Sequence, residues 1–133
     1  MGKKIIDDLV YPELSYTIVG VAYEVFNHFS YNQPEKVYQK AMVVGLQKKG
    51  LKAIPESNAD LYYLGELIHK GRMDILVEDQ VLVELKRGVR FSKAQFDQVN
   101  RYLSAKNIKL GILINFTPEG VIFRRLVNLK SNV

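Results

Sequence analysis

The sequence contains no cysteine. A chain without cysteine has no disulfide bonds, no thiolate ligands for zinc or iron–sulfur clusters, and no thiol nucleophile. Its uninterrupted apolar runs are far shorter than the roughly 18–20 residues that a membrane-spanning helix needs. The start, Met1-Gly2-Lys3-Lys4, lacks the apolar stretch of a secretory signal peptide. We therefore expect a cytoplasmic protein that is not inserted in a membrane.

Three common catalytic signatures are also missing from the sequence. It has no Walker-type phosphate loop, no glycine-rich dinucleotide fingerprint and no serine nucleophile elbow. NTP hydrolysis, dinucleotide-dependent redox catalysis and serine-based acyl transfer therefore lack support.

The composition indicates one folded domain over residues 1–133. Apolar residues make up 47% of the chain and aromatic residues 11%, which is too much for a disordered chain. Nineteen Lys and Arg against 14 Asp and Glu give a net charge of +5, which favours a polyanionic partner. The cations gather most densely between residues 86 and 93, at Lys86, Arg87, Arg90 and Lys93.

The hydrophobic pattern changes its period along the chain. Spacings of three and four residues predict helices over 14–29, from Pro34 to the Gly50 stop signal, and over 93–105. Short apolar runs predict strands over 51–55, 61–64, 73–77, 81–85, 108–114 and 121–127. The strand over 108–114 is apolar on both sides, so we expect it in the sheet interior. This order predicts an α+β or mixed α/β sheet domain.

The stretch from Gly71 to Lys86 carries the most information about function. A three-residue turn at 78–80 would pair Val77 with Val81, Ile75 with Val83, and Met73 with Leu85, which makes one face of the hairpin wholly apolar. The opposite face then places Asp74 directly across from Glu84, with Lys86 two residues further on. A two-residue turn would mix polar and apolar side chains on both faces.

Two carboxylates opposed across a hairpin repel each other unless a cation neutralises them. Mg²⁺ is the natural candidate because it prefers carboxylate oxygens and water, and Mn²⁺ could take its place. Lys86 beside such a site could activate or orient a water, or stabilise charge on a phosphate. The alternative is that Asp74 and Glu84 are solvent-facing strand residues and that Lys86 only pairs with Glu84.

The same residues carry a resemblance to a nuclease superfamily. Asp74 followed by Glu84-Leu85-Lys86 resembles the PD-(D/E)XK signature, and Gly71-Arg72-Met73-Asp74 resembles its Gly-x-x-Asp variant. Gln98-x-x-x-Tyr102 is similar to a Gln-x-x-x-Tyr motif of the subgroup that resembles helicase–nuclease repair enzymes. The two side chains are four residues apart, so they share a helix face that could turn towards Lys86.

Most of the chain, from about residue 18 to 127, resembles the small GxxExxY family within this superfamily. The matching segments are Gly20 to Phe29, Glu35-Lys36-Val37-Tyr38, Val77 to Lys86, and Gly111 to Phe116. The Gly of the family name falls at Asn32, which is a departure from the pattern.

The resemblance implies a restriction-endonuclease-like fold, with a central mixed sheet flanked by helices. It further implies a Mg²⁺-dependent phosphodiesterase acting on nucleic acid, DNA above all. Asp74, Glu84 and Glu35 would be the metal ligands, with Glu24 as the alternative third acid, and Lys86, Gln98 and Tyr102 would complete the catalytic set. Such a cluster should raise the pKa of at least one carboxyl through repulsion and burial, with Lys86 opposing the rise.

Part of this reading stays open at the level of the sequence. A nuclease-like fold that binds nucleic acid or protein without cleavage is the alternative function, although the intact acidic and Lys positions argue against it. The form of the nucleic acid and the oligomeric state are also left open.

Overall fold

The structure is a computed structural model that describes residues 10–130. Residues 1–9, on which the expectation of a chain without a leader rests, lie outside the described part, as do residues 131–133. The elements are α2 (Pro12–Phe29), α3 (Glu35–Lys48), β1 (Ala53–Asn58), β2 (Leu61–Tyr63), β3 (Glu66–His69), β4 (Arg72–Val77), β5 (Val81–Arg87), α4 (Lys93–Lys106), β6 (Leu110–Thr117) and β7 (Gly120–Val127). None of the helices over residues 10–130 is long and apolar enough to cross a membrane.

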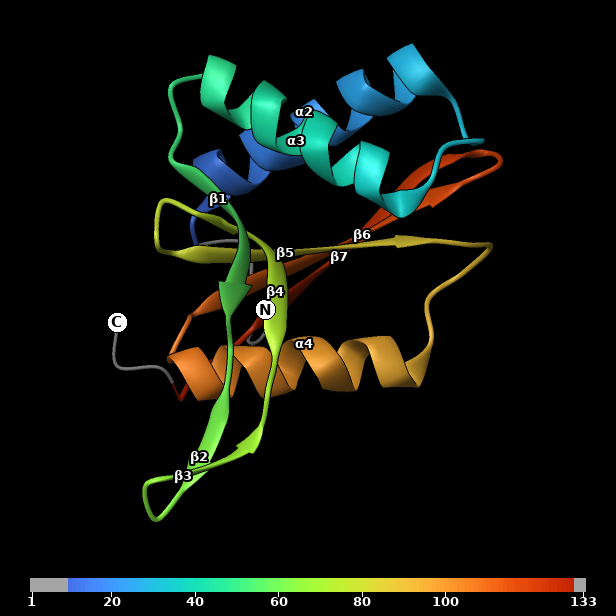
Figure 1. Cartoon of the computed structure of the whole chain (residues 1–133). Helices are drawn as coiled ribbons and strands as arrows, with labels where there is room; N and C mark the ends of the chain where they lie inside the picture. The colour runs from blue at the N-terminus through green and yellow to red at the C-terminus, as the bar shows by residue number, and fades with distance from the viewer. Residues whose placement is uncertain (1–9, 131–133) are drawn as a thin grey trace, which may run out of the picture.

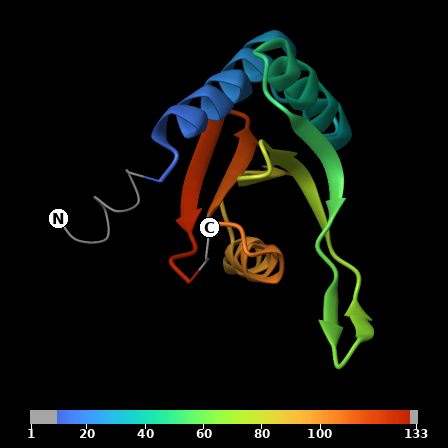
Figure 2. The ribbon, with the colours of Figure 1, turned by 90° about the vertical axis from the view of Figure 1, so that its left-hand side faces the viewer.

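A mixed five-stranded sheet in the order β1-β4-β5-β6-β7 forms the middle layer. Strands β5 and β6 run parallel, and every other neighbouring pair in this sheet is antiparallel. Helices α2 and α3 cover one face of the sheet and α4 covers the other (Figures 1 and 2). Helix α4 is the crossover that a parallel pair requires. The predicted mixed sheet flanked by helices is therefore confirmed.

The sheet separates two apolar cores. On the side of α2 and α3, residues such as Tyr38, Ile75, Val83 and Ile114 pack together. On the side of α4, Leu82 and Leu113 pack with side chains of that helix, Val99, Tyr102 and Leu103. Strand β6 lies between β5 and β7, and all eight of its residues are buried, as predicted for an interior strand.

The hairpin register agrees with the sequence pattern, with one correction. Ile75 pairs with Val83, and Val77 pairs with Val81, around the predicted turn. Met73, which we expected on the same face as Ile75, packs instead in the core on the α4 side. The β4–β5 ladder ends at Ile75 and Val83, and alternation fixes a side chain's face only while the ladder continues.

A small hairpin of β2 and β3 extends the β1–β4 pair away from the body of the protein (Figures 1 and 2). The sequence pattern predicts β2 but misses β3 and the tight turn that joins them. Two-residue hairpin turns need positive φ and therefore favour Asn-Gly, whereas this turn uses Leu64, with φ 50°, and Gly65. The expected turn signal is thus absent from the sequence.

Candidate active site

Asp74 and Glu84 lie at the point where β4 and β5 separate. The backbone N–H of Asp74 donates a hydrogen bond of 2.8 Å to Glu84 Oε1. The backbone N–H of Leu85 donates one of 2.8 Å to Asp74 Oδ2. Each carboxylate therefore accepts the hydrogen bond that a backbone carbonyl of its own strand would accept in a regular ladder. The backbone of the opposite strand thus holds each acid in place. The predicted juxtaposition of Asp74 and Glu84 is present.

A glutamine from α3 fastens this arrangement to the helix layer. Gln39 is buried, and its Nε2 donates a hydrogen bond of 2.8 Å to the backbone carbonyl of Asp74. Glu84 is 2% exposed, which is rare for a charged residue without a cation partner. Both observations describe a site built into the core of the sheet and contradict the alternative of solvent-facing strand residues.

Burial raises the pKa of both carboxyls. Removal from water, followed by the negative charge of Asp74, raises the pKa of Glu84 from its ordinary 4.5 to about 8. Removal from water also raises the pKa of Asp74, against the hydrogen bond from Leu85 and the positive charge of Lys86. The expectation of a raised carboxyl pKa opposed by Lys86 is confirmed.

Glu35 stands in the first turn of α3 and lines a cavity together with Asp74. The loop before the helix is held by the buried Tyr38, whose hydroxyl lies within hydrogen-bonding distance of the carbonyls of Ser30 and Tyr31. The ring of Tyr38 stacks on Phe116 of β6 at 4.2 Å between centroids. Tyr38 thus ties the start of α3, and with it Glu35, to the middle of the sheet.

The charges of Asp74, Lys86 and Arg87 all act on Glu35. Partial loss of hydration and then the charge of Asp74 raise its pKa, while Lys86 and Arg87 oppose the rise. Glu35 also lines a cavity of about 300 Å³ together with Asp74. Over residues 10–130, however, no three Asp, Glu or His side chains lie close enough to hold one metal ion. Without a cation between them, three carboxylates repel one another, and the ligand role of Glu35 stays a prediction.

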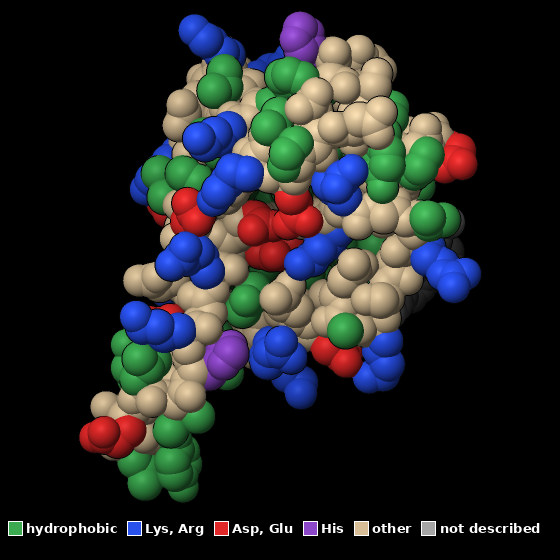
Figure 3. Space-filling model, turned by 45° about the vertical axis from the view of Figure 1, so that its right-hand side comes forward, with side chains coloured by type: hydrophobic (Ala, Val, Ile, Leu, Met, Phe, Trp, Pro, Cys, Tyr) green, Lys and Arg blue, Asp and Glu red, His purple; other side chains and the backbone are tan. Residues whose placement is uncertain are grey.

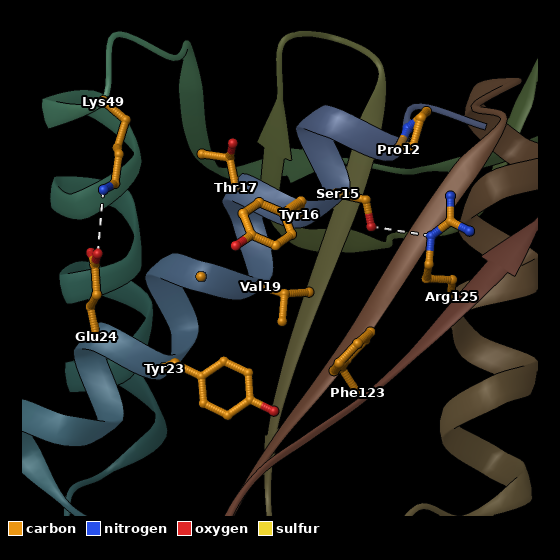
Figure 4. Close-up of a pocket in the computed structure, with 11 residues that line it drawn as sticks. Pro12, Ser15, Tyr16, Thr17, Val19, Tyr23, Glu24, Lys49, Phe123 and Arg125 are labelled. Atoms are coloured by element: carbon orange, nitrogen blue, oxygen red, sulfur yellow. Dashed lines mark hydrogen bonds and ion pairs between the residues drawn. The ribbon is translucent and has the colours of Figure 1, made fainter. Parts of the chain in front are cut away.

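Glu24, the alternative third acid, lies elsewhere. Its carboxylate pairs with Lys49 at 3.3 Å, and it lines a different cavity, between α2 and β7 (Figure 4). The two candidates are therefore separated by the structure, because only Glu35 shares a cavity with Asp74.

We expect Glu35→Ala to weaken Mg²⁺ binding by about 10–100-fold, the usual effect of losing a carboxylate that supports a metal site. Glu24→Ala is the matched control and should leave the affinity unchanged, because the Glu24–Lys49 pair is exposed. Isothermal titration of the metal-free protein with Mg²⁺ measures both. If Glu24→Ala lost Mg²⁺ affinity and Glu35→Ala did not, Glu24 would be the third acid of the site in place of Glu35.

Lys86 follows Glu84 on the same face of β5 and is half-buried. Its positive charge acts on Glu35, Asp74 and Glu84 alike. None of the ion pairs among residues 10–130 includes it. Lys86 therefore lies in the field of all three acids without being bound to one of them, and this excludes the simple Lys86–Glu84 pair among the described residues.

Gln98 and Tyr102 occur on α4 as a joined pair. Gln98 Nε2 donates a hydrogen bond of 3.4 Å to the Tyr102 hydroxyl. The ring of Tyr102 belongs to the core on the α4 side, close to Gly71 before β4. The structure thus connects this pair to the strand that carries Asp74, and the expectation that the pair places Lys86 or the phosphate stays a prediction.

A ring of cations that the sequence pattern did not single out surrounds the acids. Glu56 on β1 lies between the partners of Ile75 and Met73 and bridges Lys36 at 3.1 Å and Arg72 at 3.2 Å, which lowers its pKa. These residues line the cavity that Glu35 and Asp74 share. Figure 3 shows acidic side chains gathered on this face with Lys and Arg side chains around them, and the hairpin projecting beyond. Contacts between distant segments create this ring, so no local motif could indicate it.

The donor set fits a hard divalent cation. Asp74 and Glu84 each use one oxygen on a backbone N–H, which leaves a second carboxylate oxygen for another partner. Burial raises the pKa of both carboxyls, and the charge of Asp74 adds to the rise at Glu84, so a cation bound here would favour their charged forms. Asp74 and Glu84 would hold the ion, with Glu35 beside them, because Mg²⁺ prefers such oxygen ligands.

Comparison with known proteins agrees with this geometry. Residues 12–126 match the sequence profile of the PD-(D/E)XK nuclease superfamily. This chain belongs to that superfamily. Its mixed sheet flanked by helices is accordingly a restriction-endonuclease-like fold. Proteins of this superfamily are generally nucleases that use divalent metals such as Mg²⁺.

Two other comparisons add no evidence about the function of the chain. The crystal structure of SSO0001 is similar with a TM-score of 0.48 and 16% sequence identity over 92% of this chain and 62% of that chain. This chain thus spans less than two thirds of the length of that protein. A search of curated proteins finds no match to the chain.

Proposed function

We propose that this PD-(D/E)XK protein is a Mg²⁺-dependent nuclease that hydrolyses phosphodiester bonds in DNA. The observation that carries the proposal is the pair of carboxylates, the half-buried Asp74 and the buried Glu84, bound to each other's strands at the end of the β4–β5 ladder. The narrower GxxExxY membership, the single domain over 1–133 and the cytoplasmic location belong to the same proposal.

The divalent ion, when bound, would supply a Lewis acid for the scissile phosphate. Residues of the chain itself place the metal site and the attacking water. Asp74 and Glu84 concentrate negative charge at a fixed place because their strands hold them. Lys86 presents an ammonium to the same place, where it orients the attacking water and stabilises negative charge that develops on the phosphate oxygens. The water oxygen forms the new P–O bond while the P–O bond to the sugar breaks. The water gives up one proton to solvent, and the departing sugar oxygen takes one up from solvent.

Cations from the end of β5 onwards supply the contact with the nucleic-acid backbone. Arg87 lies over the ring of Tyr31, 4.9 Å from its centroid, at the edge of the acidic site. Arg90 lines a separate cavity near the start of α4, beside Phe91. Lys93 forms an ion pair with Asp97 at 2.9 Å. Positive charge next to the acids compensates for their repulsion of phosphate and favours a polyanionic substrate.

Lys86→Ala is expected to reduce cleavage by about 10²–10³-fold, as loss of one preorganised charge donor does in other enzymes. The purified full chain should be incubated with duplex, single-stranded and branched DNA, and with RNA, in Mg²⁺ or Mn²⁺ and in EDTA. Lys48→Ala is the matched control, because it removes the same charge at the far end of α3, roughly 20 Å from Glu35.

Metal-dependent cleavage that is lost in Lys86→Ala and kept in Lys48→Ala supports the proposal. Binding of DNA without cleavage in either metal would instead identify a nuclease-like binding module. Cleavage of RNA but not of DNA would support phosphodiester hydrolysis and would change the proposed substrate from DNA to RNA.

A further inference from the structure

Asn115 on β6 is a fully buried polar residue without a hydrogen-bond partner. Its exposure is 0%, and neither Oδ1 nor Nδ2 of its amide has a partner among the described residues. A buried amide without hydrogen bonds costs stability, and an apolar side chain of similar size would not. An exception of this kind in a strand whose other side chains, Thr117 apart, are apolar suggests a role other than folding.

The register places Asn115 next to Lys86. The two residues are partners across the parallel β5–β6 ladder, two positions beyond the Glu84–Leu113 pair. The neighbours of Asn115 on its own strand, Ile114 and Phe116, pack towards α2 and α3, so Asn115 faces the α4 side together with Leu113. Adjacent strands lie about 4.8 Å apart, a gap that the four-carbon stem of a lysine spans.

The other neighbours of Asn115 along this part of β6 do not require a hydrogen bond from its amide. On the other side of the strand its partner is Ile122 of β7, which has no polar side-chain atom. The next residue on the same face, Thr117, already donates its hydroxyl hydrogen to the carbonyl of Gly120 at 2.8 Å. Of the two residues that pair with Asn115 across the sheet, Lys86 and Ile122, Lys86 is therefore the one whose side chain can use the Asn115 amide.

We propose that Asn115 is the positioning residue for Lys86. Its Oδ1 accepts a hydrogen bond from the Lys86 ammonium when nucleic acid is bound, which directs the remaining ammonium protons at the scissile phosphate. Asn115 itself does not touch the substrate, because it has no exposed surface. A neutral amide suits this task, since it orients the cation without cancelling its charge. The inference rests on the proposed nuclease function and adds a residue to its site.

The first test combines stability with kinetics. Asn115→Leu should keep or raise the melting temperature and lower kcat by about 10–100-fold, with KM changed by less than about twofold. Asn115→Asp, which keeps an oxygen acceptor at the same place, should recover part of kcat. In the background of Lys86→Ala the Leu substitution should cause no further loss, because the amide acts through the lysine. Full kcat in Asn115→Leu, or losses that multiply in the double variant, would overturn the proposal.

The second test does not depend on cleavage. The side-chain amide of Asn115 is followed by nitrogen–proton NMR while a phosphorothioate DNA oligonucleotide is added, in the wild type and in Lys86→Met. A shift of this amide signal in the wild type that disappears in Lys86→Met supports the pairing, even if the wild type cleaves nothing. Identical responses in both proteins would refute it. A failure of the nuclease proposal is thereby separated from a failure of the Asn115 proposal.

Discussion

Glu84→Gln is expected to abolish metal-dependent cleavage and, in the same molecule, to stabilise the metal-free protein at pH 8–9. Glutamine keeps the oxygen that accepts the Asp74 N–H, so the junction of the two strands is preserved. It carries no charge, so it neither repels Asp74 nor binds a cation well. We expect cleavage to fall by about 10³-fold or more.

The pH dependence follows from the raised pKa of Glu84. The folded protein holds the proton of this carboxyl more tightly than the unfolded chain, up to a pKa of about 8 instead of 4.5. The stabilisation is therefore complete below pH 4.5 and is lost as the pH rises through about 8. The metal-free wild type should lose on the order of 2–4 kcal/mol of unfolding free energy over this range, and Glu84→Gln should lose much less.

Urea unfolding in EDTA at pH 5 and pH 9 measures this difference, and repetition with Mg²⁺ tests the metal site. Mg²⁺ should restore the stability of the wild type at pH 9 and have little effect on the variant, because only the wild type offers both carboxylates. Equal pH dependence in the two proteins would show that Glu84 is not the buried charge. Retained cleavage would remove Glu84 from the metal site.

Gly71→Ala is expected to destabilise the protein by about 2–3 kcal/mol. A methyl group at this position would meet the carbonyl oxygen of Ala59 at 2.4 Å and a ring carbon of Tyr102 at 2.9 Å. The backbone cannot withdraw, because the Ala59 N–H donates to the Gly71 carbonyl and the Gly71 N–H donates to Asp60 Oδ1. The close approach of these segments explains why glycine stands three residues before Asp74.

Gly20→Ala provides a control for which the expected change in stability has the opposite sign. Gly20 lies inside α2, and a methyl group there meets no atom within 4 Å. Alanine in a helix interior is favoured over glycine by about 1 kcal/mol, so stability should rise. Chemical denaturation of both variants decides the matter, and similar small effects of the two substitutions would contradict the packing around Gly71.

Local periodicity was enough to predict most of the elements and the hairpin register. The apolar alternation of Ile75, Val77, Val81 and Val83 allows one pairing, because a slip of one residue would place the apolar side chains and the acids on the same face. That register also brought Asp74 opposite Glu84, so the pair could be predicted without a structure. The turn at Leu64 could not, because its sequence lacks the residues that such turns favour.

Within the site, the sequence by itself determined the Asp74, Glu84 and Lys86 motif, because these residues adjoin the paired strands of one hairpin whose register the apolar alternation fixes. Only the tertiary structure decided the rest. It brought Glu35 to Asp74 and left Glu24 with Lys49, and it joined Glu56 to Lys36 and Arg72. It also turned Met73 towards α4 and set the unpartnered Asn115 beside Lys86. The physical reason is that these relations depend on how separate helices and strands pack, and packing between distant segments leaves no periodic trace in the chain.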